Sequence, residues 1–132
     1  MIGLDTNILV RLLVVDDRQQ ADLARKFVKE RCTVEEPGFI SLLVICELVW
    51  TLGRTYGFGQ AEVAAAIESI LHDPILKVES HPQVMMALQR LRKEGADFPD
   101  SLVAEVNRAH GCNVTATFDR KAAKLDDFVL VR

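Results

Sequence analysis

The sequence predicts an α/β fold in which helices cover both faces of a mostly parallel sheet of about five strands. Short apolar runs of strand length alternate with longer segments whose apolar residues recur at helical spacing. This alternation is typical of right-handed crossovers, in which consecutive strands run parallel. The 132 residues show no internal repeat and no linker-like segment. We therefore expect a single domain over residues 1–132.

Each predicted element has a local signal in the sequence. Strands are predicted where short apolar runs end at turn or capping residues, at about residues 1–4, 39–42, 75–78, 114–118 and 128–131. Helices are predicted between these runs where apolar residues recur at helical spacing, at about residues 7–14, 17–31, 42–56, 61–71, 81–93, 98–110 and 120–125. Gly95 and Gly111 are expected to end the helices that precede them.

The composition excludes several classes of protein. A net charge of −3 does not resemble a basic protein that wraps nucleic acid, and 49% hydrophobic residues argue against disorder. The three cysteines show no CxxC spacing, so we expect free thiols in a reducing compartment. No apolar run approaches the ~20 residues that a membrane span needs. With a strand at residue 1 and no room for a signal peptide, we expect a cytoplasmic protein.

Two aspartates are expected at the carboxyl ends of strands. Asp5 ends the first apolar run, and Asp119 follows the run over residues 114–118. Each also stands directly before a helical segment, so each suits the N-cap of that helix equally well. In open parallel sheets, ligands bind outside the carboxyl ends of the strands. Both carboxylates are therefore candidates for a binding site.

Glu47 is the only acidic residue in the apolar helix predicted over residues 42–56. Its neighbours one turn away are mostly apolar, and a lone carboxylate on such a face is costly unless it is paired or bound to metal. We expect Glu47 to bind metal. The alternative is a buried ion pair with Arg54.

A further acidic site is predicted at the start of the helix over residues 98–110. Asp97 has the position of its N-cap, and Asp100 lies at about the third helical position, where an acid is ordinary capping and dipole chemistry. One cap suffices, however, and Asp97 provides it. Asp100 also shares a stripe with Val103, on the side of the helix opposite Glu105. We therefore expect Asp100 to point inward as a ligand.

The four acids are expected to meet at one edge of the sheet, because helix starts and strand ends share that edge. Several carboxylates held close together raise one another's pKa and favour either protonation or a bound cation. Ligand sets made only of oxygen select hard cations such as Mg²⁺ or Mn²⁺, which activate water and assist displacement at phosphorus. No serine–histidine–aspartate set, reactive cysteine–histidine pair, GxGxxG motif or P-loop competes with this interpretation.

Four segments together resemble the PIN-domain nucleases, and among them the VapC-type toxin ribonucleases of prokaryotic toxin–antitoxin pairs. They are Ile-Gly-Leu-Asp-Thr-Asn at residues 2–7, Glu47 in its apolar helix, Gly-Ala-Asp-Phe-Pro-Asp-Ser-Leu-Val-Ala at 95–104, and Thr-Phe-Asp-Arg at 117–120. Each segment alone is a loose match, whereas the set, in the family's order and spacing, is specific. Pro99 departs from the family pattern and leaves open whether Asp97 or Asp100 is the direct ligand.

The resemblance implies a three-layer α/β/α fold and an endoribonuclease that depends on Mg²⁺ or Mn²⁺. It also implies an RNA substrate, a homodimer or a higher assembly, and inhibition by a small antitoxin that binds a groove between helices. Carried over by position, metal binding and catalysis fall on Asp5, Glu47, Asp100 and Asp119, with support from Thr6 and Asp97.

Two other functions are compatible with the sequence. A non-catalytic binding module would use the same fold, although such a module has no physical reason to retain a repulsive cluster of acids. A phosphatase of the haloacid-dehalogenase type would need a second aspartate two residues after Asp5, where Asn7 stands instead. Basic residues near the proposed edge suit either RNA phosphates or a solvated surface, and these are Arg11, Arg54, Arg120, Lys121 and Lys124.

Overall fold

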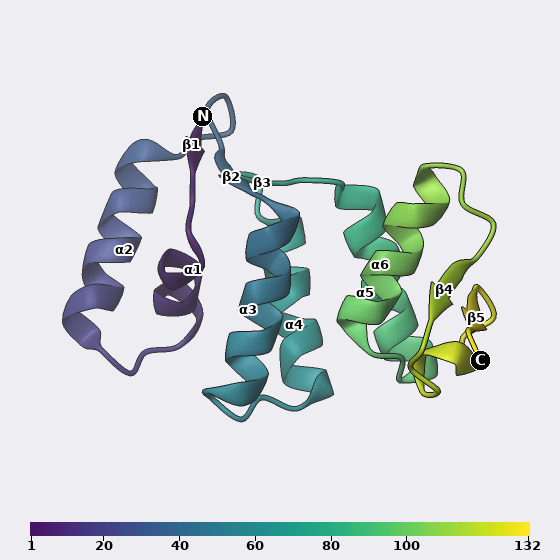
Figure 1. Cartoon of the computed structure of the whole chain (residues 1–132). Coiled ribbons are helices and arrows are strands. Elements are labelled where there is room, and N and C mark those ends of the chain that lie inside the picture. Colours follow the sequence, from purple (N-terminus) through teal and green to yellow (C-terminus); the bar gives the residue numbers. More distant parts are fainter. The chain divides into compact units, whose positions relative to one another are not determined.

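The computed structural model describes all 132 residues, which form two compact units, residues 1–81 and 82–132. Six α-helices, one 3₁₀ helix and five short strands alternate along the chain (Figure 1). Every strand pair is parallel, which confirms the predicted α/β class. The strands differ from the prediction in forming one three-stranded and one two-stranded sheet rather than a single one, because the backbone pairing stays within each unit.

The sheet of the first unit has the order β1–β2–β3, with strands at Ile2–Gly3, Gly38–Ile40 and Leu76–Val78. Two helices connect each strand to the next, as parallel pairing requires. Because all three strands run the same way, their carboxyl ends lie at one edge. Ser41 and Glu79 directly follow β2 and β3 at this edge, and Asp5 follows β1 after one intervening residue.

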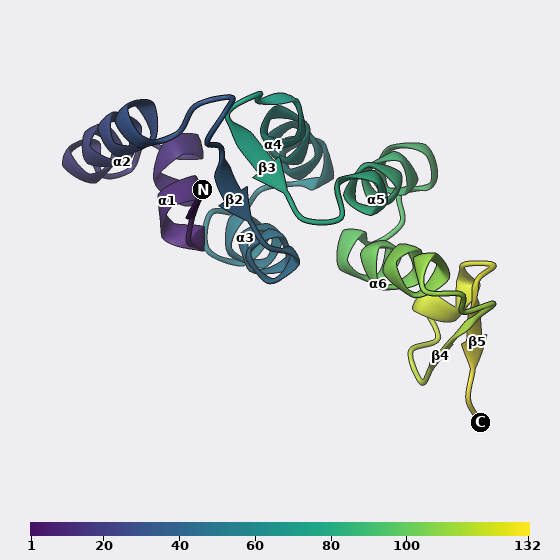
Figure 2. The same ribbon diagram turned by 90° about the horizontal axis from the view of Figure 1, so that it is seen from above.

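Helices α1 (Thr6–Leu13), α2 (Arg18–Arg31), α3 (Leu42–Arg54) and α4 (Gln60–His72) complete the first unit. Helix α1 packs against α2 and α3, and α4 packs against β3 and α3 (Figures 1 and 2). The core where they meet is aliphatic, as expected from the periodicity of the sequence. Its side chains with less than 2% exposure include Leu9, Ile40, Ile45, Leu48, Leu52 and Ile67.

The second unit contains α5 (His81–Glu94), which begins at the last residue of the first unit, and α6 (Phe98–Ala109). Strand β4 (Thr115–Thr117), the 3₁₀ helix η1 (Ala122–Lys124) and β5 (Phe128–Leu130) follow. Gly95 and Gly111 end the two helices as predicted, with φ angles of 65° and 93° that favour glycine. None of the helices in the protein is both long and apolar enough to cross a membrane.

A partly buried network of charges joins the elements of the second unit. Arg90 on α5 contacts Glu105 on α6 at 3.0 Å and Asp127, just before β5, at 2.6 Å. Arg108 also contacts Asp127, at 2.7 Å. The hydrogen bonds from Arg90 lower the pKa of Asp127 below its ordinary value.

This network corrects the predicted orientation of α6. Glu105 is 3% exposed, whereas Val103, expected on the inward side, is 49% exposed. Glu105 tolerates burial because the guanidinium of Arg90 neutralises it.

We predict that Arg90→Leu destabilises the second unit by about 3 kcal/mol, because the buried Glu105 loses its nearer cation and keeps only Arg108, 4.0 Å away. Urea unfolding followed by circular dichroism measures this loss. Because Asp127 has a lowered pKa in the folded state, its pairing stabilises the protein above about pH 4 and is lost as the pH falls further. The difference in the free energy of unfolding between the variant and the wild type should therefore become smaller as the pH falls. Lys93→Leu, at an exposed position of α5, is the control, and an equal loss of stability there would contradict the prediction.

We predict opposite effects of adding a methyl group at two glycines of the first unit. A Cβ at Gly38 would lie 2.7 Å from Leu4 Cδ1 and 3.0 Å from Cys32 Sγ, so Gly38→Ala should cost about 1–3 kcal/mol. Gly53 lies in α3 with open space around it, so Gly53→Ala should add about 0.5–1 kcal/mol. Thermal unfolding of both variants checks the pair, and a Gly38→Ala protein as stable as wild type would show that β2 is packed less tightly.

Candidate functional site

Asp5 follows β1 and caps α1, so both interpretations of its position hold. Its Oδ1 accepts a hydrogen bond from the amide of Thr6 at 2.8 Å, and the side chain is exposed. Thr6 itself is 3% exposed, and its hydroxyl oxygen is buried without a hydrogen-bond partner. Buried polar atoms are rarely left unpaired, because they lose hydration without compensation. Two side-chain oxygens that could bind a cation, from Asp5 and Thr6, thus lie next to each other after β1. The Thr6 hydroxyl makes no hydrogen bond within the protein.

Glu47 lies on the exposed side of α3, which corrects the prediction that it is buried among apolar residues. The inward face of α3 consists of Ile45, Leu48 and Leu52. The burial cost that favoured a metal therefore does not apply to Glu47. The alternative ion pair does not form either, since the guanidinium of Arg54 lies over the ring of Trp50 instead. Glu47 is a solvent-accessible carboxylate.

The start of α6 brings acids together within the second unit. Asp97 is the N-cap, and its Oδ2 accepts a hydrogen bond from the amide of Asp100 at 3.0 Å. The half-buried Asp100 has a raised pKa, chiefly because of burial and then because of the negative charges of Asp97 and Asp119. Lys121 opposes this shift. Asp100 and Asp119, predicted to meet although they lie on different elements, are therefore close enough to repel each other.

Asp119 also caps the turn that leads into η1. Its Oδ1 accepts hydrogen bonds from the amides of Lys121 at 2.8 Å and Ala122 at 3.4 Å. The Thr117 hydroxyl accepts one from the Asp119 amide at 2.9 Å. These bonds hold the exposed carboxylate in a defined place after β4. They occupy one of its two oxygens and leave the other available.

The predicted site residues are divided between the two units. The first unit carries Asp5, Thr6 and Glu47, and the second carries Asp97, Asp100 and Asp119. Within either unit, no group of three or more histidine, cysteine, aspartate or glutamate side chains is arranged to hold a metal ion. The convergence of the four acids on one cation stays a prediction.

One acid at the strand-end edge was missed by the sequence reasoning. Glu79 directly follows β3, and its Oε1 accepts a hydrogen bond from the Leu42 amide at 2.8 Å. With Ser41, whose hydroxyl accepts from the Val44 amide, it caps α3. In the sequence, Glu79 could have been identified by its position directly after the third predicted strand. Glu79 holds in place the helix that carries Glu47.

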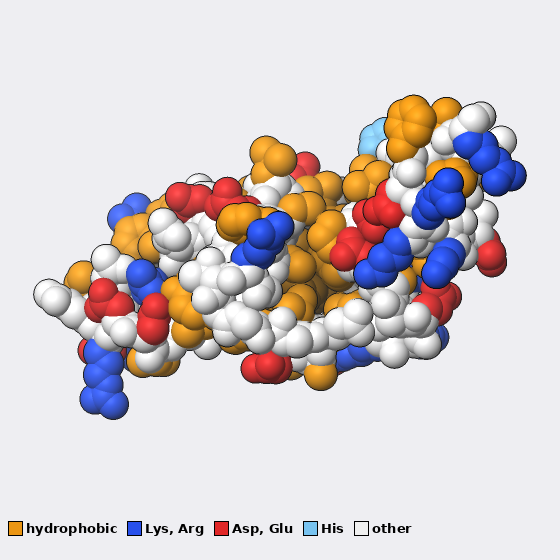
Figure 3. Space-filling model, turned by 60° about the horizontal axis from the view of Figure 1, so that its bottom comes forward, with side chains coloured by type: hydrophobic (Ala, Val, Ile, Leu, Met, Phe, Trp, Pro, Cys, Tyr) orange, Lys and Arg blue, Asp and Glu red, His pale blue; other side chains and the backbone are white.

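The basic residues differ in how far they are already engaged. Arg11 donates hydrogen bonds to Asp16 at 2.6 Å and to Gln20 at 2.7 Å. Its guanidinium therefore connects the end of α1 with the start of α2. Arg54 stacks on Trp50 but is exposed, as are Arg120 and Lys124. Acidic and basic side chains are interspersed on the face shown in Figure 3, with hydrophobic side chains among them. Phosphate contacts are therefore best sought at the exposed cations and not at Arg11.

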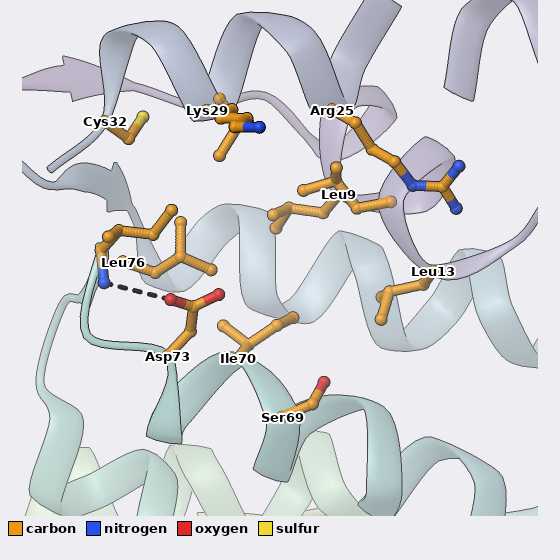
Figure 4. A pocket seen from close by; sticks show the side chains of 12 residues that line it. Leu9, Leu13, Arg25, Lys29, Cys32, Ser69, Ile70, Asp73 and Leu76 are labelled. Carbon is orange, nitrogen blue, oxygen red and sulfur yellow. Dashed lines mark hydrogen bonds between the residues drawn. The ribbon is translucent and has the colours of Figure 1, made fainter. Parts of the chain in front are cut away.

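An apolar groove of about 590 Å³ lies in the first unit. Its walls come from α1, α2, α4 and the segment that enters β3 (Figure 4). Leu9, Leu13 and Ile70 supply the apolar surface, while Arg25 and Lys29 add positive charge from α2. Asp73 lies at the opposite side, with its carboxylate bonded to the Ile75 amide at 3.1 Å.

Comparisons with known proteins identify the family of the chain. The chain matches the PIN domain family over residues 2–127, a range that includes all the candidate site residues. It is 27% identical over 122 residues to the VapC ribonuclease of Aquifex aeolicus (strain VF5), covering 92% of this chain and 90% of that protein. It is also similar to the crystal structure of Mycobacterium tuberculosis VapC20, a Sarcin-Ricin loop cleaving toxin, at 21% identity and a TM-score of 0.47, covering 100% of this chain and 99% of that one. Since the family match runs through both units, the chain belongs to the PIN domain family and is a distant relative of the VapC ribonuclease toxins.

Proposed function

We propose that the protein is a metal-dependent endoribonuclease and the toxin of a type II toxin–antitoxin pair. One observation supports this most strongly: Asp100 is half-buried beside Asp97 and Asp119, and its pKa is raised, first by burial and then by the negative charges of these two carboxylates. A stable fold keeps such an arrangement at a cost in free energy, which a bound cation offsets. The relationship to VapC ribonucleases indicates that the substrate is RNA. An RNA-cleaving toxin would act in the cytoplasm.

The residues present fit a hard cation such as Mg²⁺ or Mn²⁺, because the candidate donors are all oxygens. Asp5, Glu47, Asp100 and Asp119 would hold the cation, and the unpartnered hydroxyl of Thr6 would support it. When bound, the cation activates water and neutralises charge that develops on the phosphodiester. The proposal requires the two units to form one domain, which is supported by the single family match through residues 2–127.

The remaining residues of the site position the acids. Asp97 caps α6 and so orients the turn that carries Asp100. Glu79 and Ser41 cap α3, which carries Glu47. The amide hydrogen bonds from Lys121 and Ala122 hold Asp119. The backbone that carries each of these acids is thus held in place, which lowers the free energy needed to assemble the metal site.

We also propose that the apolar groove of the first unit receives the antitoxin. An amphipathic segment would bury its apolar side chains on Leu9, Leu13 and Ile70 and place acidic residues near Arg25 and Lys29. The homodimer implied by the resemblance to VapC toxins is part of the same proposal. Sedimentation of the purified protein, alone and with its antitoxin, measures both assemblies.

We predict that Asp100→Asn lowers Mg²⁺-dependent RNA cleavage by at least about 100-fold, because a neutral amide is a poor substitute for a carboxylate ligand. Cleavage of labelled RNA and calorimetric titration with Mn²⁺ measure the two consequences. Asp126→Asn, at an exposed acid of the same unit, is the matched control. Equal cleavage by wild type and Asp100→Asn would remove the assignment of a nuclease site to Asp100. Mn²⁺ binding by the wild type without any cleavage would favour the non-catalytic binding module.

We predict that Ser69→Trp prevents association with the antitoxin and leaves RNA cleavage intact. Ser69 is exposed and lines the groove, so a large side chain there fills the space without disturbing the core. Co-purification of the two proteins after co-expression is the measurement. Ser69→Ala should bind normally, and an antitoxin that still binds the Ser69→Trp protein must dock elsewhere.

A further inference from the structure

The outer face of α3 presents an acid, an aromatic ring and a cation in succession. Glu47, Trp50 and Arg54 are all exposed, and their spacing of three and four residues places them on one stripe of the helix. At the rise of an α-helix, Trp50 lies ~4.5 Å and Arg54 ~10.5 Å along the axis from Glu47. The stripe therefore begins at a proposed metal ligand and continues for two turns.

Trp50 combines unusual exposure with a charged partner. Its side chain is 58% exposed, although tryptophan usually buries most of its surface. The guanidinium carbon of Arg54 lies 5.5 Å from the centroid of its ring, within the range of a cation–π contact. The contact orients both side chains on the helix surface. Much of the indole remains open to a ligand.

We propose that Trp50 and Arg54 form a subsite for one nucleobase of single-stranded RNA, next to the phosphate that is cut. This inference rests on the proposed ribonuclease function. The exposed indole stacks on the base, and the guanidinium of Arg54 contacts a flanking phosphate. Stacking does not distinguish strongly among bases, since each has a π face. The subsite would thus place the strand beside Glu47 rather than choose its sequence.

The character of the stripe favours RNA over a protein partner. Trp and Arg are common at the centres of protein–protein interfaces, but acids are depleted there, whereas Trp50 has the carboxylate of Glu47 one turn away. Leu43, at 83% exposure, lies beyond Glu47 and is separated from Trp50 by that carboxylate. An aromatic ring with an adjacent cation is the usual composition of a surface that binds single strands.

The protein contains a single tryptophan, so fluorescence excited selectively at tryptophan reports on this subsite alone. A short single-stranded RNA, added in the presence of EDTA to prevent cleavage, should quench this fluorescence until binding saturates. An oligonucleotide of equal length without bases has the phosphates but nothing to stack, and it should quench far less. RNA that binds without changing the fluorescence would overturn the proposal.

Substitutions test the energetic contribution of the ring. Trp50→Ala should weaken RNA binding roughly 5- to 100-fold, measured by anisotropy of labelled RNA in EDTA, and Trp50→Phe should restore most of it. The matched control is Phe27→Ala, because Phe27 on α2 carries the same kind of contact, with Arg31 at 5.4 Å from its ring. Equal weakening by Phe27→Ala, or none by Trp50→Ala, would contradict the proposal.

The same variants separate this inference from the nuclease assignment. If wild-type protein binds RNA and quenches as expected but does not cleave with Mg²⁺, the nuclease assignment fails and the subsite stands. If Trp50→Ala cleaves with an unchanged KM, the subsite fails and the nuclease stands. Sedimentation distinguishes a third outcome. If Trp50→Ala no longer forms a dimer but binds RNA as well as wild type, the stripe is a contact between copies of the chain, and the subsite proposal is wrong.

Discussion

Three strands of only two or three residues hold the first unit together, and they do so in parallel. Their ladders are extended by the Leu4 amide donating to the Phe39 carbonyl and the Glu79 amide donating to that of Ile40. Parallel pairing requires long crossovers, which explains why paired helices separate consecutive strands. It also turns every strand end toward one edge. Asp5 and the caps of α3 lie at that edge as a direct result.

The second unit reaches stability by a different route. A two-stranded sheet is marginal in water, and β4 and β5 are three residues each. The ion pairs of Arg90 with Glu105 and Asp127 add stabilising contacts between the helices and the residue before β5. A further hydrogen bond joins Asn107 on α6 to Thr115 on β4 at 3.0 Å. The Asn107–Thr115 bond connects the strand that precedes Asp119 to the helix that carries Asp100.

The proposed functions occupy separate surfaces of the first unit. The groove among α1, α2 and α4 is apolar and edged with cations, which suits a protein segment. The outer stripe of α3 alternates charge with an aromatic ring, which suits a nucleic acid strand. Asp5 and Thr6 lie at the start of α1, and Glu47 lies on α3. A partner in the groove and a strand on α3 would therefore both approach the proposed metal edge.

Features that depend on neighbouring residues were evident in the sequence. The glycine ends of α5 and α6, the Asp97 cap and the alternation of strands with helices follow from local backbone preferences, and all were predicted correctly. Orientation was decided only by tertiary contacts. Glu105 is inward because Arg90, fifteen residues earlier on another helix, neutralises it, and Glu47 faces outward because Ile45, Leu48 and Leu52 fill the core beneath α3. Helical spacing tells which residues share a face, but only the packed partners determine which face is buried.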